Sequence, residues 1–233
     1  MQKKEALLPS VFITGAKSGL GKVTAEHFLS LGARVFAADI DNCDVTNFST
    51  VSKFVDSLPE IPRIWVNCAG VVHAKRVIKM SPDEFKNIIN INLIGTFNVI
   101  KCAVNKLSSL EEIQNGERGV IINTASIASS EGQVGQVAYS ASKAGVVGMT
   151  LPLARELASL GIRVVTIAPG VMDTPMSNQI SEAVKNNLIN NVPFPKRLGK
   201  PQEFALLVQH IVENHYLNGE VIRLDGALRM AAI

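Results

Sequence analysis

Short apolar runs rich in β-branched residues alternate along the chain with longer stretches whose pattern favours helices. The runs are almost continuously apolar, which is typical of strands in a parallel sheet that helices cover on both faces. Two of the intervening stretches, Ser81 to Leu107 and Ser140 to Leu160, are long enough for helical crossovers. The pattern therefore predicts a doubly wound α/β fold. Six strands are expected, at Val11 to Thr14, Val35 to Ala38, Ile64 to Asn67, Val120 to Asn123, Val164 to Ile167 and Val221 to Leu224.

One helix has a well-marked start. Ser81-Pro82-Asp83-Glu84 combines a capping serine, a proline in the first turn and acidic residues near the positive end of the helix dipole. Farther along, the segment Val171 to Lys200 is rich in Asn, Pro and Ser and is expected to be a mobile excursion that covers the substrate.

The composition fits one domain that spans residues 1–233. A chain of 233 residues with 47% hydrophobic content can cover both faces of a single sheet, and it contains no internal repeat or low-complexity linker. A net charge of +3 with 18% charged residues is mild and gives no reason to expect a nucleic-acid partner. No apolar run reaches the roughly 18 residues that cross a bilayer, so no membrane partner is expected.

The cellular compartment is predicted from the N-terminus and the cysteines. Residues Met1 to Pro9 carry Lys3 and Lys4, but no hydrophobic stretch typical of a targeting signal follows them. The cysteines are odd in number, and neither they nor the histidines have ligand-like spacing, so free thiols and no metal site are expected. These features predict a cytoplasmic protein. The cysteines are Cys43, Cys68 and Cys102.

A glycine-rich turn follows the first predicted strand and leads directly into a helical pattern. It reads Thr14-Gly15-Ala16-Lys17-Ser18-Gly19-Leu20-Gly21. Glycines let the backbone turn tightly and approach a pyrophosphate, which the free amides of a helix N-terminus then stabilise. Such a turn can also be an ordinary loop, but its place between a strand and a helix favours a dinucleotide site and a Rossmann-like sheet.

Asp39 ends the second predicted strand, near the separation at which a carboxylate accepts the ribose hydroxyls of a dinucleotide. The same carboxylate repels the 2′-phosphate of NADP, so the sequence favours NAD, with NADP the less favoured cofactor. Lys17 in the glycine turn is the opposing signal, because its charge could attract that phosphate. The alternative for Lys17 is a solvated side chain in a loop.

Tyr139 and Lys143 are four residues apart in a helical pattern, which places both side chains on one helix face. An ammonium group near a phenol favours the phenolate and is expected to lower its pKa from about 10, making the phenol a usable acid or base. Ser126 follows a predicted strand at the carboxyl edge of the sheet, where its hydroxyl can bond to a substrate oxygen. A Tyr-x-x-x-Lys pair alone is often only an exposed pair, but the upstream nucleotide site favours catalysis.

Four motifs together resemble the short-chain dehydrogenase/reductase family: the turn Thr14 to Gly21, Asn67-Cys68-Ala69-Gly70, the Ser126/Tyr139/Lys143 set, and Pro169-Gly170. The resemblance implies that Asn92 is a fourth catalytic residue that holds a water in a proton relay. Its alternative role is that of a helix-kink residue in a subunit contact. The resemblance also implies that Gly70 lies beside the cofactor and that Thr174 binds the nicotinamide carboxamide.

Within this family, the chain is most similar to the group of type 2 3-hydroxyacyl-CoA dehydrogenases, also called 17β-hydroxysteroid dehydrogenase type 10. The likeness extends over Gly119 to Ser126, Glu131 to Gln136, Tyr139 to Arg155, Val192 to Gly199, and Leu217 to Gly226. It implies a homotetramer. Gln133 and Gln136 are expected near the substrate, or else in a role that stabilises their loop. The residues implied to contact NAD are Ser18, Leu20, Asp39, Cys68, Tyr139, Lys143, Met172 and Thr174.

Two departures from the family pattern stand out. Only four residues separate Asp39 from Asp44, where the family usually has a helix and a third strand, so one edge of the sheet is expected to lose a strand. Asp44 and Val45 match the motif that brackets the adenine ring, and the deletion puts that contact in question. The loop Val71 to Ser81 is also short. It carries cations that either meet the phosphates of an acyl-CoA or are merely solvated, namely Lys75, Arg76 and Lys79.

The leading hypothesis is an NAD-dependent dehydrogenase of fatty-acid metabolism that oxidises a secondary alcohol, most naturally a 3-hydroxyacyl-CoA or a hydroxysteroid-like compound. The alternative enzyme is an NADP-dependent 3-oxoacyl-acyl carrier protein reductase, which Asp39 argues against. The alternative from another class is a nucleotide-sensing regulatory protein without catalysis. That hypothesis predicts loss of Tyr139 or Lys143, and both are present.

Overall fold

The computed structural model describes residues 9–230, and all six predicted strands are present in it. Residues 1–8 lie outside the described residues, and so does the N-terminal stretch with Lys3 and Lys4 in which we expected no targeting signal. The strands are β1 (Val11–Thr14), β2 (Val35–Ala38), β3 (Ile64–Asn67), β4 (Gly119–Thr124), β5 (Ile162–Pro169) and β6 (Val221–Leu224). The main helices are α1 (Gly19–Ser30), α2 (Phe48–Asp56), α3 (Pro82–Ile89), α4 (Gly95–Leu107), α5 (Val137–Leu157), α6 (Glu182–Asn191) and α7 (Pro201–Glu213).

The six strands form one parallel sheet in the order β2-β1-β3-β4-β5-β6. The chain first moves from β1 to β2 and then crosses back to β3, so the winding direction reverses between β1 and β3. Ligands of open α/β sheets bind at the carboxyl ends of the strands beside such a reversal. The predicted doubly wound, Rossmann-like fold is therefore confirmed, and its topology places a ligand site near the glycine turn after β1.

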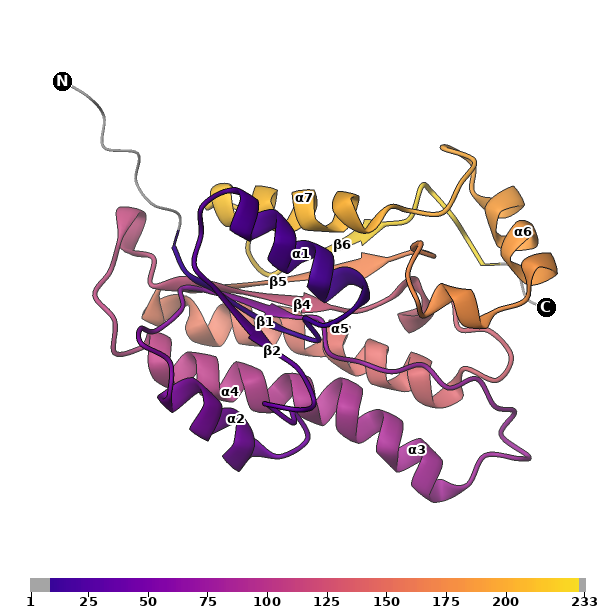
Figure 1. Cartoon of the computed structure of the whole chain (residues 1–233), viewed down its shortest axis with the longest axis horizontal. Helices are drawn as coiled ribbons and strands as arrows, with labels where there is room; N and C mark the ends of the chain where they lie inside the picture. The colour runs from indigo at the N-terminus through magenta and orange to yellow at the C-terminus, as the bar shows by residue number, and fades with distance from the viewer. Residues whose placement is uncertain (1–8, 231–233) are drawn as a thin grey trace.

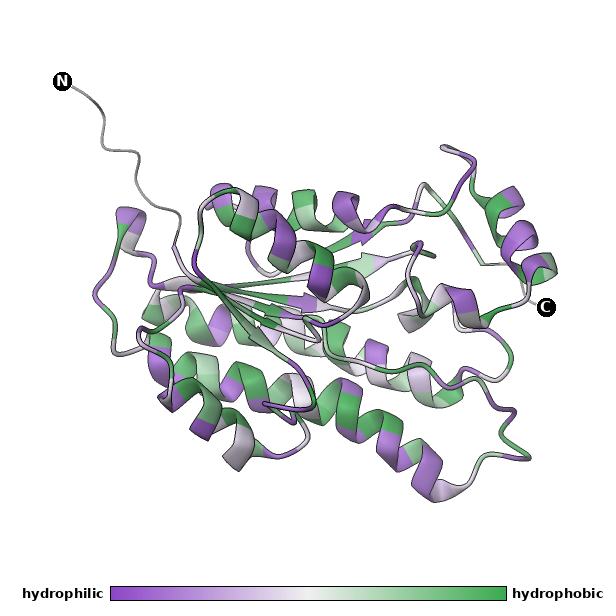
Figure 2. Cartoon of the chain, in the orientation of Figure 1, coloured by the Kyte–Doolittle hydropathy of each residue, from purple (hydrophilic) through white to green (hydrophobic). Residues whose placement is uncertain are grey.

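Helices cover both faces of the sheet (Figure 1). On one face α1 and α7 pack on the strands around Phe28 and Phe204, and on the other α2, α4 and α5 pack around Phe12 and Trp65. The strands are mainly hydrophobic, and the helices place many of their polar positions away from the sheet (Figure 2). This two-sided burial explains why the strands read as continuous apolar runs.

β2 forms one edge of the sheet, as the short connection after Asp39 predicts, and β6 forms the other. The side-chain amide of Asn42 covers the open edge: its Nδ2 donates to the carbonyl oxygen of Ala37 at 3.2 Å, and its Oδ1 accepts from the amide of Asp39 at 2.7 Å. One side chain thus satisfies two backbone groups that a neighbouring strand would otherwise pair, which protects the edge and holds Asp39 in place.

The crossover between β3 and β4 contains one long helix in three parts, in which α3 and α4 are joined by a π-helical turn at Asn90–Ile94. It begins at Ser81 with the predicted cap, because Ser81 and Glu84 form a reciprocal capping box. By length and composition alone, the helix Pro82–Leu107 could cross a membrane. Half of its most apolar 18-residue stretch is buried inside the protein. Its buried residues, such as Val99, Ile100 and Ala103, pack against the sheet as part of the core.

The expected excursion between Val171 and Lys200 contains the helix α6. Its two ends are tied together, since Asp173 N donates to Gly199 O at 2.8 Å and Gly199 N donates to Val171 O at 3.0 Å. The segment therefore leaves the end of β5 and returns to the same place. Its mobility stays a prediction.

Candidate active site

A cleft of about 640 Å³ opens at the carboxyl ends of the central strands. It extends from the glycine turn and the end of β2, past the loop after β3, to the start of α5. Most of the residues that we predicted for the site line this cleft, which confirms that the fold brings them together. They are Gly15, Ser18, Leu20, Asp39, Asp44, Val45, Cys68, Gly70, Ser126, Gln136, Tyr139, Lys143, Met172 and Thr174.

The glycine turn is shaped to admit a diphosphate. Gly15 has φ +66°, and a Cβ on it would lie 2.9 Å from the amide nitrogen of Ala69. At Gly21 a Cβ would overlap the carbonyl oxygen of Gly15. A Cβ on Gly19 would have more room, because its nearest neighbour, Thr174 Cβ, would lie 3.7 Å away. Within the described residues, Ser18 makes no side-chain cap to the first turn of α1. The free amides of that turn therefore fit the pyrophosphate of a dinucleotide cofactor.

We expect Gly21→Ala to raise the dissociation constant for NADH at least about tenfold, because α1 must move away from the turn to admit the methyl group. The measurement is titration of the nicotinamide fluorescence. Gly148→Ala is the matched control, since a Cβ at that position of α5 meets no atom within 4 Å. Unchanged NADH binding in Gly21→Ala would contradict the placement of the cofactor on this turn.

Asp39 presents its carboxylate at the end of β2, where Lys17 N donates to Oδ2 at 2.9 Å and Ile40 N donates to Oδ1 at 2.8 Å. The Lys17 side chain is not simply solvated, as one of our alternatives held. Its ammonium forms an ion pair with Asp41.

The deletion after Asp39 leaves the next motif in the cleft. Asp44 accepts from the amide and the hydroxyl of Thr46 at 2.9 and 2.8 Å, and Asn98 donates to the carbonyl of Val45 at 2.9 Å. Val45 packs so closely on Gly95 that a Cβ there would lie 2.7 Å from Val45 Cγ2. Asp44 and Val45 therefore still line the cleft without that helix and strand, and their contact with an adenine ring stays a prediction.

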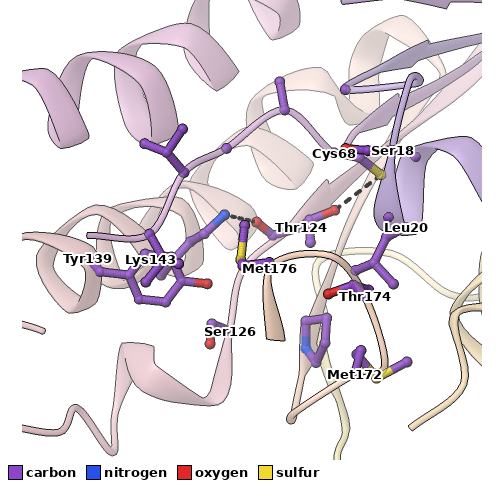
Figure 3. Close-up of a pocket in the computed structure, with 18 of the residues that line it drawn as sticks. Ser18, Leu20, Cys68, Thr124, Ser126, Tyr139, Lys143, Met172, Thr174 and Met176 are labelled. Carbon is purple, nitrogen blue, oxygen red and sulfur yellow. Dashed lines mark hydrogen bonds between the residues drawn. The ribbon is translucent and has the colours of Figure 1, made fainter. Parts of the chain in front are cut away.

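Ser126, Tyr139 and Lys143 meet at the other end of the cleft (Figure 3). Tyr139 and Lys143 lie one turn apart on α5, with Lys143 Nζ 5.8 Å from the centre of the tyrosine ring. Lys143 is only 5% exposed and donates to the carbonyl oxygen of Thr124 at 2.8 Å. Ser126 follows β4, and its hydroxyl oxygen accepts from Ala128 N at 3.1 Å. Two hydroxyls and an ammonium therefore face one small volume.

The predicted lowering of the tyrosine pKa is wrong for the protein without cofactor. Burial raises the pKa of Tyr139 above 10, although the Ser126 hydroxyl opposes this. Burial also lowers the pKa of Lys143 to about 8. The reason is that Lys143 directs its ammonium to the carbonyl of Thr124 rather than to the phenol, while Lys143 is buried and Tyr139 is partly buried.

Asn92 is fully buried in the π-helical turn and does not line the cleft. Its amide accepts from Val71 N at 2.8 Å, donates to Val71 O at 2.9 Å, and donates to Ser142 Oγ at 3.0 Å. Asn92 thus joins the loop after β3 to α5, and the role of a helix-kink residue in a subunit contact stays a prediction. The proton relay stays a prediction.

Gln133 takes the loop-stabilising role that we considered as the alternative to a place near the substrate. Its side chain turns back on its own loop, where Nε2 donates to the carbonyl of Glu131 at 3.3 Å. It lines a separate hollow with Arg76 rather than the cleft. Gln136 does line the cleft, while its Oε1 accepts from Gln133 N at 3.1 Å. Of the loop cations, Lys75 is paired with Glu84 at 2.6 Å.

Sequence reasoning missed the apolar wall of the cleft. Four residues from the segment after β5, from α6 and from the C-terminal end of the described chain supply it, and no motif marks them. They are Met176, Ile180, Leu188 and Met230. In residues 9–230, no group of three or more His, Cys, Asp or Glu side chains could hold a metal ion. Cys43, Cys68 and Cys102 are free thiols.

Comparison with known proteins identifies the class. A family model described as short chain dehydrogenase matches residues 38–185, which is more than half of the chain. The chain therefore belongs to the short-chain dehydrogenase family and is an oxidoreductase, as its motifs predict.

Individual relatives support the narrower resemblance. The chain is 47% identical to the 3-hydroxyacyl-CoA dehydrogenase type-2 of Bos taurus, over 94% of each protein. It is 34% identical to a 3-oxoacyl-[acyl-carrier-protein] reductase of Thermotoga maritima, over 93% of this chain and 96% of that protein. Among solved structures, a 3-hydroxyacyl-CoA dehydrogenase type-2 from Mycobacterium avium superposes with a TM-score of 0.89 at 36% identity, covering 96% of this chain and 97% of the other.

Proposed function

We propose that the protein is an NAD-dependent dehydrogenase that interconverts 3-hydroxyacyl-CoA and 3-oxoacyl-CoA. The observation that carries the proposal is the meeting of Ser126, Tyr139 and Lys143 in a cleft whose other end presents Asp39. The relatives named 3-hydroxyacyl-CoA dehydrogenase type-2 support the substrate class. The apolar wall formed by Met176, Ile180, Leu188 and Met230 suits an aliphatic acyl chain.

Each catalytic residue has one task in alcohol oxidation. The Tyr139 oxygen, as phenolate, takes the proton of the substrate hydroxyl, and Ser126 donates a hydrogen bond to the same substrate oxygen. Lys143, whose Nζ lies 5.8 Å from the centre of the tyrosine ring, places positive charge at the site, although in the cofactor-free protein it bonds to the carbonyl of Thr124 and burial dominates the pKa of Tyr139. The glycine turn and Asp39 would hold the nicotinamide cofactor, which would supply the acceptor for the hydride of the carbinol carbon. In the reverse direction Tyr139 returns the proton to the oxygen.

The alternatives are less well supported. An NADP-dependent 3-oxoacyl-acyl carrier protein reductase needs a cation for the 2′-phosphate, but Asp39 lies at that position and Lys17 is paired with Asp41. A regulatory protein without catalysis has no need of the Ser126, Tyr139 and Lys143 arrangement, and all three side chains are in place.

The test is a spectrophotometric assay with acetoacetyl-CoA and either NADH or NADPH. We expect oxidation of NADH and little oxidation of NADPH. Turnover with NADPH alone would contradict the NAD proposal and favour the reductase. Binding of NADH without turnover of acetoacetyl-CoA or of 3-hydroxyacyl-CoA would contradict the substrate proposal.

We further propose that the enzyme is a cytoplasmic homotetramer that acts on small molecules, without nucleic-acid or membrane partners. The mild net charge of +3 and the free thiols support this setting. Ile94, Phe97 and Leu151 are 44%, 46% and 45% exposed on the long helix and α5, and they offer an apolar surface for a subunit contact. Light scattering of the purified protein tests the tetramer, and a monomer at micromolar concentration would contradict it.

A further inference from the structure

The shortened connection after β2 forms a tight turn beside the glycine-rich turn. Asn42 N and Cys43 N both donate to the carbonyl oxygen of Asp39, at 3.0 and 2.7 Å. Asn42 also holds the amide of Asp39 through its own side chain. The chain therefore reverses immediately after Asp39, the residue that we propose binds the cofactor ribose, and Asp41 lies at the tip of that turn.

This turn changes the charge around the ribose end of the cleft. The backbone amide of Lys17 donates to Asp39 Oδ2 at 2.9 Å, which holds Lys17 beside the end of β2. Its ammonium forms an ion pair with Asp41. Asp39 and Asp44 both line the cleft at this end. Three carboxylates and one ammonium give a local charge of −2, and the one cation among them already has a partner.

We propose that Asp41 is a second residue that determines cofactor specificity, because it neutralises Lys17. With Lys17 free, a 2′-phosphate at the ribose would find a cation in the glycine turn. With Lys17 paired, the phosphate meets only net negative charge. The inference rests on the proposed use of NAD and adds that discrimination is shared between Asp39 and a residue of the shortened connection.

The pair acts through local charge and not through the stability of the fold. Both side chains are more than half exposed, at 59% for Lys17 and 61% for Asp41. Exposed ion pairs contribute little to folding, so variants at both positions are expected to fold. A dianionic 2′-phosphate bound beside the pair nevertheless responds to the loss of one negative charge, which leaves the ammonium of Lys17 unpaired.

The test is a double-mutant cycle on cofactor binding, with Asp41→Asn, Lys17→Gln and the double variant. Dissociation constants for NADPH and NADH are measured by nicotinamide fluorescence at low ionic strength, where exposed charges are least screened. We expect Asp41→Asn to tighten NADPH binding about tenfold and to change NADH binding less than about twofold. In the Lys17→Gln background, the same change is expected to tighten NADPH less than about threefold.

Asp83→Asn is the charge-matched control, because Asp83 is 93% exposed on α3, away from the cleft. Equal tightening with and without Lys17 would overturn the proposal, since Asp41 would then act only by its own repulsion. Equal effects on NADPH and NADH, or no effect, would also overturn it. No acyl-CoA is present, so failure of the substrate proposal leaves this result unaffected. A wild type that prefers NADPH contradicts the proposed use of NAD itself.

Discussion

Replacing Tyr139 with phenylalanine is expected to lower kcat for acetoacetyl-CoA reduction at least about 10³-fold, because the variant lacks the oxygen that exchanges a proton with the substrate. The ring stays beside Lys143 in the cleft, so the dissociation constant for NADH should change less than about twofold. Steady-state kinetics and a separate NADH fluorescence titration measure the two quantities.

Tyr216→Phe provides a matched control for this prediction. It removes the chain's other phenol, which is 100% exposed, and is expected to retain wild-type kinetics. A Tyr139→Phe enzyme that keeps more than about a tenth of kcat would show that another group moves the proton, which would contradict the assigned role. A parallel loss of NADH binding would instead assign Tyr139 a binding role.

The strands and the glycine turn could be predicted because local signals determine them. Continuous apolar runs such as Ile64–Asn67 have one stable environment, a strand buried on both faces. The turn at Gly15 requires a positive φ, which glycine adopts at little cost. The spacing of Tyr139 and Lys143 likewise fixes their common helix face, so this part of the site follows from the sequence.

Other features depend on contacts between distant segments. The apolar wall combines Leu188 of α6 with Met230 near the C-terminal end of the described residues, and no local spacing reports that meeting. Gln133 turns away from the cleft because the carbonyl of Glu131 lies within its reach. Asn92, in the π-helical turn of the long helix, bonds to Val71 and Ser142, which lie 21 and 50 residues away along the chain.

The predicted lowering of the pKa of Tyr139 was wrong for a related reason. Spacing shows that an ammonium lies on the same helix face as the phenol, but it does not show the depth of burial or the competing acceptor. The carbonyl of Thr124 holds Lys143, and burial then raises the pKa of Tyr139. Burial also destabilises the charged form of Lys143 and lowers its pKa to about 8. The site therefore keeps a cation at a cost to the stability of the fold.

Lys143→Met is accordingly expected to lower kcat at least about 100-fold and yet to raise the melting temperature of the cofactor-free protein at pH 7. A shift from 10.5 to about 8 corresponds to a penalty of about 3 kcal/mol for the buried ammonium. Loss of the bond to Thr124 O costs about 1–2 kcal/mol of this gain. The net increase in the free energy of unfolding is about 1–2 kcal/mol, which raises the melting temperature by roughly 2–8 °C for a chain of this size.

The dependence of this difference on pH separates charge burial from a simple packing effect. Below about pH 8 both folded and unfolded wild type carry the proton on Lys143, and the full penalty applies. Between about pH 8 and 10.5 only the unfolded state keeps it, so wild-type stability rises relative to the variant. Scanning calorimetry from pH 7 to 10.5 should therefore show the advantage of Lys143→Met shrinking and then reversing, because the lost hydrogen bond remains. A difference independent of pH would contradict burial of a charged Lys143 as its cause.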